Sequence, residues 1–140
     1  MDKALVLKKL QALRRCVDRI ESKRPDDPLP LRSDYDLQDI LSVNLERAVQ
    51  ACVDVAAHLI SDTSRPSPET MAGCFAELRA MTVLDDALAD RLQKAVGFRN
   101  IAVHEYQEID WDIVFSIVTK NLDDFRAYAR AVMAHCGLAL

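Results

Sequence analysis

Apolar residues recur at intervals of three or four positions through nearly the whole of this 140-residue chain. That spacing places them on one face of an α-helix, and no segment alternates apolar and polar residues over the length of a strand. One series runs from Val6 to Ile20, and a longer one runs from Leu37 to Leu59. The pattern predicts an all-α fold, an antiparallel bundle of four or five helices.

Prolines and capping residues predict where the first two helices begin and end. The first helix is expected to end near Arg24, because three prolines follow within six residues and cannot continue it. We expect this proline-rich stretch to be a loop. Ser33 or Asp34 then offers an N-cap for a second helix that extends to about Ser61.

Three further helices are expected in the second half of the chain. Ser67, followed by Pro68 at the first helical position, is a start signal for a short helix that ends near Ala80. Thr82 is the expected cap of the next helix. The last helix follows the sequence IDWD at residues 109–112 and carries apolar residues at every third or fourth position.

Length and composition predict one globular domain, residues 1–140. Half of the residues are hydrophobic and 29% are charged, which is typical of a folded protein with its own core. The longest apolar runs are far shorter than the roughly 20 residues that span a bilayer, and the N-terminal sequence lacks a long uncharged stretch. We therefore expect a cytoplasmic protein that does not bind membranes.

The net charge of −4 argues against broad neutralisation of nucleic-acid phosphates, and so against a DNA-binding protein. Any contact with RNA must be local. The first 24 residues contain eight Lys and Arg against three Asp and Glu. Most of these basic residues are expected to form a solvated helix face, and a few of them are candidates to guide an RNA strand.

Neither the cysteines nor the carboxylates predict a metal site. The four cysteines are far apart, without a CxxC pair, and we expect buried free thiols. The acidic residues of the second half have spacings that suit helix starts and solvated surfaces: Asp85, Asp86, Asp90, Glu105, Glu108, Asp110 and Asp112. We expect no metal and no other cofactor.

Reactive polar side chains are concentrated in the segment GFRNIAVHEY, residues 97–106. Arg99 can stabilise a pentacovalent phosphate through a bidentate contact. His104 can move the proton of an RNA 2′-hydroxyl near neutral pH. Together with Asn100 and Tyr106, these residues are the candidate site of a metal-independent transesterification of RNA.

Helix geometry constrains this candidate site. Five residues along an ideal helix turn by about 140° and rise by about 7.5 Å, so Arg99 and His104 do not share a face. Either the helix ends or bends near His104, helped by Gly97, or a second subunit completes the site. Asn100 and His104 do share a face, so the amide is a candidate to orient the imidazole.

The pattern RxxxxH followed by xY, formed by Arg99, His104 and Tyr106, resembles the HEPN superfamily and specifically the HepT toxins. The segments Asn44 to Ile60 and Ile109 to Phe125 resemble the second and last helices of that family. The resemblance implies a helical homodimer whose two motifs face each other in a cleft and cleave RNA without metal, which arrests growth. It gives Arg99 and His104 the catalytic roles.

The resemblance also implies a protein partner, a minimal nucleotidyltransferase antitoxin that transfers AMP from ATP onto the tyrosine of the motif, here Tyr106. Such a modification adds bulk and negative charge beside a site that binds phosphate. The alternative is a non-catalytic helical adaptor that positions a nucleotidyltransferase or its nucleotide.

Purely structural roles remain open for the motif residues. His104 is suited to a helix C-terminus, Arg99 to an ion pair with a neighbouring helix, and Tyr106 to the edge of the core. His58 and His135 lie in apolar helical stretches, and we interpret both as structural.

Overall fold

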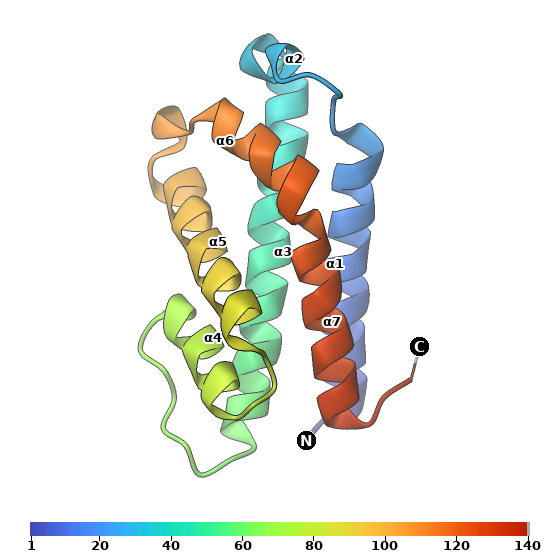
Figure 1. Cartoon of the computed structure of the whole chain (residues 1–140), viewed down its shortest axis with the longest axis vertical. Coiled ribbons are helices and arrows are strands. Elements are labelled where there is room, and N and C mark those ends of the chain that lie inside the picture. Colours follow the sequence, from blue (N-terminus) through green and yellow to red (C-terminus); the bar gives the residue numbers. More distant parts are fainter. Residues whose placement is uncertain (140) are drawn as a thin grey trace.

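The longest helix, α3 (Tyr35–Ser61), is the axis around which the other helices pack. The computed structural model describes residues 1–139 and contains helices but no strand within them. It places α1 (Lys3–Lys23) on one side of α3 and α5 (Asp86–His104) on the other, while α7 (Leu122–Cys136) crosses in front (Figure 1). The predicted all-α class is confirmed.

The apolar series of α1 and α3 supply the centre of the core. The apolar series of α1 consists of Val6, Leu10, Leu13, Val17 and Ile20, and each of these residues is at most 5% exposed. The series of α3 starts at Leu37, which is partly buried, and its later members up to Leu59 are all buried. Tyr128 on α7 is fully buried against the edge of the Phe75 ring, and its hydroxyl donates to the Cys52 carbonyl at 2.7 Å. Phe75 belongs to α4 (Met71–Ala80), so these contacts join α7, α4 and α3 into one core.

Side-chain caps begin most of the helices. In five of them, the side chain of the residue before the helix accepts a hydrogen bond from a backbone N–H of the first turn. The five caps are Asp2, Asp34, Thr70, Asp85 and Asp110. Asp34 is therefore the cap of α3, one of the two residues that the sequence offered for that position.

The proline-rich stretch contains a helical turn, so the prediction of a continuous loop there was wrong. α2 (Leu29–Ser33) forms because Pro30 occupies a first-turn position, where a missing backbone N–H costs no hydrogen bond. Leu31 is fully buried and anchors this turn on the core.

Two of the expected helix starts were also wrong. α4 (Met71–Ala80) begins at Met71 rather than at Pro68, because Thr70 supplies the cap. α5 begins after Asp85, whose carboxylate accepts from the backbone N–H of Leu88 at 2.7 Å. Thr82 instead lies in the left-handed region, with φ of 61°, in the turn that ends α4.

The expected single last helix is interrupted. α6 (Trp111–Ser116) continues into a π-helical turn (Ile117–Asn121) before α7 begins. The Arg24 guanidinium donates to the carbonyl of Val118 within this turn at 2.9 Å. The expected four or five helices are thus the long ones of a set of seven in residues 1–139.

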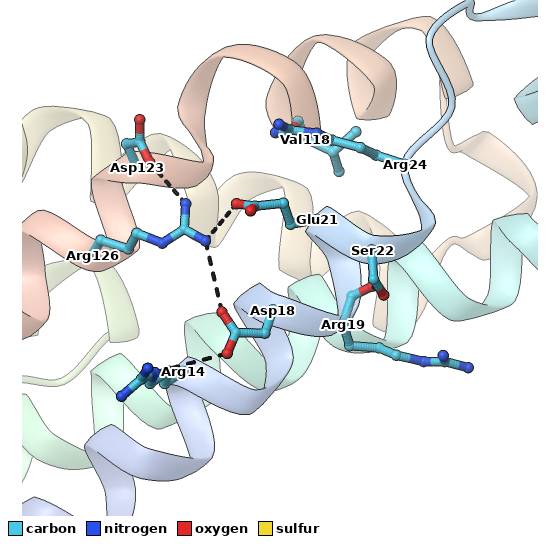
Figure 2. Close-up of polar contacts among 9 residues, drawn as sticks. All are labelled: Arg14, Asp18, Arg19, Glu21, Ser22, Arg24, Val118, Asp123 and Arg126. Carbon is cyan, nitrogen blue, oxygen red and sulfur yellow. Dashed lines mark hydrogen bonds and ion pairs between the residues drawn. The ribbon is translucent and has the colours of Figure 1, made fainter.

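Ion pairs on the surface link α1 to α7. The Arg126 guanidinium contacts the carboxylates of Asp18, Glu21 and Asp123, and Asp18 also pairs with Arg14 (Figure 2). Each exposed pair contributes little alone, but an α7 arginine shared by two α1 carboxylates, Asp18 and Glu21, restricts how α7 lies on α1.

Within residues 1–139, no helix is both long enough and apolar enough to cross a membrane.

Candidate active site

Arg99 lies near the C-terminal end of α5 and reaches toward α3. Its Nη2 donates to the side-chain oxygen of Gln50 at 3.3 Å, and its Nη1 donates to that of Asn100 at 3.4 Å. Its Nε is buried and has no hydrogen-bond partner within residues 1–139. No carboxylate of these residues lies within 4.0 Å of the guanidinium, so the structure does not show the expected alternative of an ion pair.

Gln50 is itself held in one orientation. Its side-chain nitrogen donates to Asp54 at 2.8 Å, and Asp54 also accepts from Lys9 at 3.0 Å. The amide nitrogen therefore faces Asp54 and the amide oxygen faces Arg99. This series of contacts runs from α1 across α3 to α5 and fixes the guanidinium.

Glu46 lies one turn before Gln50 on α3, on the side of Arg99. Burial raises the pKa of the Glu46 carboxyl, and the charges of Arg99 and Arg47 partly offset that rise. Arg99 is thus held by neutral amides and has a carboxyl group nearby rather than in contact. A guanidinium in this state keeps charge available for an anionic ligand.

His104 is the last residue of α5. The backbone N–H of Glu105 donates to the carbonyl of Ile101 at 2.8 Å, and the chain then leaves the helix. The helix therefore ends at His104, which was one of the expected alternatives. The His104 side chain is exposed, whereas Arg99 is directed toward α3, so one chain alone does not bring the two side chains face to face.

Asn100 pairs with Arg99, its neighbour in sequence, and no hydrogen bond joins it to His104 in the described part of the chain. Its expected role in orienting the imidazole stays a prediction.

Tyr106 begins a 3₁₀ turn (Tyr106–Glu108) directly after α5. Its hydroxyl donates to Oδ1 of Asp39 on α3 at 2.7 Å, and its ring packs edge-on against Trp111 with 5.9 Å between ring centroids. Burial raises the pKa of the Tyr106 hydroxyl, and the hydrogen bond to Asp39 raises it further. The phenol is therefore protonated at neutral pH and anchored by Asp39, while 41% of the residue is exposed.

Three polar residues of this region were missed at the sequence level: Asp39, Glu46 and Gln50. They interrupt the apolar helix α3 at positions seven and four residues apart, which places them along one edge of the helix. That spacing is the signal that identifies them, but their partners on α5 and the turn after it are about 50 or more residues away in the sequence.

An apolar groove runs beside the site, between α5 and the α6–α7 segment. Phe98 and Ile101 of α5 line it on one side, and Ile109, Ile113 and Ile117 line it on the other. Ile101 is 40% exposed and Ile113 is 56% exposed, so the groove is open to solvent in the single chain.

Comparison with known proteins decides the family. The model of the family described as ribonuclease HepT-like matches residues 10–132. The chain belongs to this family. The resemblance to the HepT toxins is thereby confirmed, and ribonuclease is confirmed as the enzyme class of the family.

The HepT-like chain is similar over nearly its full length to curated nucleases. It is 34% identical to the mRNA nuclease HepT of Shewanella oneidensis, over 93% of this chain and 97% of that protein. It is 27% identical to the tRNA nuclease HepT of Aphanizomenon flos-aquae, over 96% of this chain and 92% of that protein.

A solved structure gives the same fold. The tri-AMPylated Shewanella oneidensis HEPN toxin, in complex with its MNT antitoxin, superposes with a TM-score of 0.86 at 34% identity, covering 93% of this chain and 97% of the toxin.

The remaining histidines and the cysteines of the HepT-like chain lie outside the site. The Nε2 of His58 accepts from the backbone N–H of Asp2 at 3.1 Å, which is a structural role, and His135 is exposed on α7. The four cysteines are buried and free, as expected. Residues 1–139 contain no group of three or more His, Cys, Asp and Glu suited to hold a metal ion.

Proposed function

We propose that this HepT-like chain is a metal-independent endoribonuclease toxin in which Arg99 and His104 carry the reaction. The observation that supports this most is the state of Arg99, which two neutral amides hold in place while no carboxylate of residues 1–139 contacts it. In this mechanism Arg99 binds the scissile phosphate, and His104 takes the proton of the 2′-hydroxyl or returns one to the leaving 5′-oxygen. The 2′-oxygen–phosphorus bond forms as the bond to the 5′-oxygen breaks.

The same geometry supports a homodimer. Arg99 is directed toward α3 and His104 outward, so a second copy is the simplest way to place an arginine and a histidine on either side of one phosphate. Gly97 and His104 are seven residues apart and share a face of α5, and Ile101 lies between them on the same side. Apart from the backbone of its own helix, a Cβ at Gly97 would meet no atom of residues 1–139 within 4 Å, so a second α5 has room to approach there.

The proposal that the chain is a toxin, and that a partner regulates it, rests on the relatives. The similar Shewanella toxin is tri-AMPylated and bound to an MNT antitoxin. By analogy, a minimal nucleotidyltransferase adds AMP to Tyr106, a residue that is 41% exposed and lies two positions after His104. The phosphate charge added there opposes the binding of RNA phosphate.

The deciding experiment is cleavage of RNA by the purified chain in the presence of EDTA, comparing the unaltered protein with His104→Ala. His135→Ala is the matched control, because His135 is exposed at the far end of α7. Circular dichroism checks the fold of each variant, and mass spectrometry first shows that Tyr106 is unmodified. We expect cleavage by the unaltered chain and the control only.

Three outcomes count against the proposal. Equal cleavage by His104→Ala removes the catalytic role of that residue. Cleavage that EDTA abolishes and magnesium restores removes metal independence. Absence of cleavage by every form favours the adaptor.

A further inference from the structure

We propose that Asp39 is the base that accepts the phenolic proton when Tyr106 receives a nucleotidyl group. This inference rests on the proposed modification of Tyr106 and assigns part of that reaction to the toxin itself.

The contact between the two residues is direct. The Tyr106 hydroxyl and Oδ1 of Asp39 are 2.7 Å apart, which is the distance of a good O–H to carboxylate hydrogen bond. Trp111 holds the tyrosine ring from the side, at the start of α6. The acceptor, the donor and the ring support therefore come from three separate elements, which hold the hydroxyl in one position.

The surroundings of Tyr106 keep its proton in place at neutral pH. Burial raises the pKa of the hydroxyl most, the hydrogen bond to Asp39 adds to the rise, and Ser42 opposes it. Glu46 is the other carboxylate of α3 whose charge raises this pKa. Because the phenolate is disfavoured, the oxygen becomes a strong nucleophile only as its proton is removed during the attack.

Asp39 is placed to remove that proton. As the tyrosine oxygen attacks the α-phosphorus of a nucleoside triphosphate, the oxygen–phosphorus bond forms and the phosphorus–oxygen bond to pyrophosphate breaks. Pyrophosphate leaves with its electron pair, and the phenolic proton moves to Asp39. Asp39 is exposed, so it returns the proton to water.

The product no longer fits the starting position. The esterified oxygen has no proton to donate, and its new phosphate carries a negative charge next to the Asp39 carboxylate. Repulsion between the two groups moves the modified side chain away from α3.

Adenosine 5′-phosphorimidazolide tests the role of Asp39 without a partner enzyme, because it transfers AMP directly to a nucleophile and releases imidazole. Tyr106 and Tyr35 are the only tyrosines of the tryptic peptides 100–120 and 33–47, so mass spectrometry follows each separately. Acid treatment before digestion removes any label on His104. Tyr35 is 76% exposed and serves as the internal reference.

The variant is Asp39→Asn, which keeps a side-chain oxygen as acceptor but is not a base. Asp86→Asn is the control, since Asp86 is an exposed carboxylate of the first turn of α5, at the end of that helix opposite to Tyr106. We expect Tyr106 to be labelled about tenfold more slowly in Asp39→Asn at neutral pH, and labelling of Tyr35 to be equal in all proteins.

The pH profile separates a base from a residue that only positions the ring. With Asp39 present, the labelling rate of Tyr106 changes little around neutral pH. In Asp39→Asn we expect the rate to rise with pH, because only the phenolate reacts. Three results overturn the role of Asp39. They are parallel pH profiles for the unaltered chain and Asp39→Asn, equal rates of Tyr106 labelling in these two proteins, and no labelling of Tyr106 in the unaltered chain while Tyr35 reacts. Those results leave the ribonuclease proposal intact, since RNA cleavage is not measured here.

Discussion

The Arg99 guanidinium is tied to α3 by Gln50, whose side-chain oxygen accepts from Nη2 at 3.3 Å. Asp54 fixes the orientation of this amide and is in turn paired with Lys9 of α1. The candidate catalytic arginine is thus positioned by a series of contacts that crosses three helices, and Asn100 of its own helix supplies a further partner.

Changing Gln50→Glu tests whether the neutral partner matters. A carboxylate at this position pairs with Arg99 and neutralises the charge that the proposed mechanism uses for the RNA phosphate. We expect the cleavage rate to fall by about tenfold or more, in the range seen when one transition-state donor is lost. Initial rates with a labelled RNA and circular dichroism of each variant provide the measurement.

Gln11→Glu is the matched control, because Gln11 is an exposed amide on α1 that undergoes the same change of charge. It is expected to retain full activity. Unchanged cleavage by Gln50→Glu would show that the amide contact is not part of the phosphate site.

The outer face of α5 is the proposed contact between two copies. Ile101→Asp places a charge on that face, and we expect it to convert a dimer into a monomer in light scattering coupled to size exclusion. Cleavage is expected to fall with dimerisation, because each site then lacks its second half. Leu29→Asp is the control, since Leu29 is 61% exposed on α2, away from α5.

An active monomer of the unaltered chain is the result that contradicts this arrangement. A dimer that persists in Ile101→Asp assigns the contact to another surface.

The ion-pair cluster between α1 and α7 predicts a salt-dependent stability (Figure 2). Arg126→Met removes three carboxylate contacts, and we expect the free energy of unfolding to fall by about 1 kcal/mol at low salt. The loss is expected to shrink at high salt, because exposed charges are screened. Urea unfolding at two salt concentrations measures this loss of stability. Arg130→Met is the control, because Arg130 is exposed on the same helix. An equal loss of stability at both salt concentrations assigns the effect of Arg126→Met to packing.

Local patterns predicted burial well, because helical spacing alone decides which residues share a face. The buried stripes of α1 and α3 follow from neighbours in the sequence, which also limited the cap of α3 to Ser33 or Asp34. The start of α5 did not follow, because Thr82 and Asp85 are both competent caps. The turn after α4, which places Thr82 at positive φ, decides between them.

In the candidate site too, local sequence predicted some residues, while others depend on how the helices pack. Arg99, His104 and Tyr106 were predicted from their spacing within eight residues, and an end of the helix near His104 was one of the expected alternatives. Gln50 and Asp39 were not found, because hydrogen bonds that span 49 and 67 residues depend on how α3 packs against α5.

Buried ionisable groups predict that the chain loses stability at alkaline pH. Burial raises the pKa of the Tyr128 hydroxyl well above its ordinary value of 10.0 and that of the Cys52 thiol well above 9.0. In the unfolded chain these groups lose protons at their ordinary values, whereas the folded chain keeps them. Their contribution to stability is therefore complete below about pH 9 and is lost as the pH rises further.

Urea unfolding under reducing conditions, at about pH 8 and about pH 10.5, measures this loss. We expect Tyr128→Phe to lower the free energy of unfolding by about 1 kcal/mol at the lower pH, because the hydrogen bond to the Cys52 carbonyl is removed. The same variant is expected to lose less stability between the two pH values than the unaltered chain, since one ionising group is gone. An equal loss in both proteins would mean that Tyr128 does not contribute to the alkaline transition and that the thiols account for it.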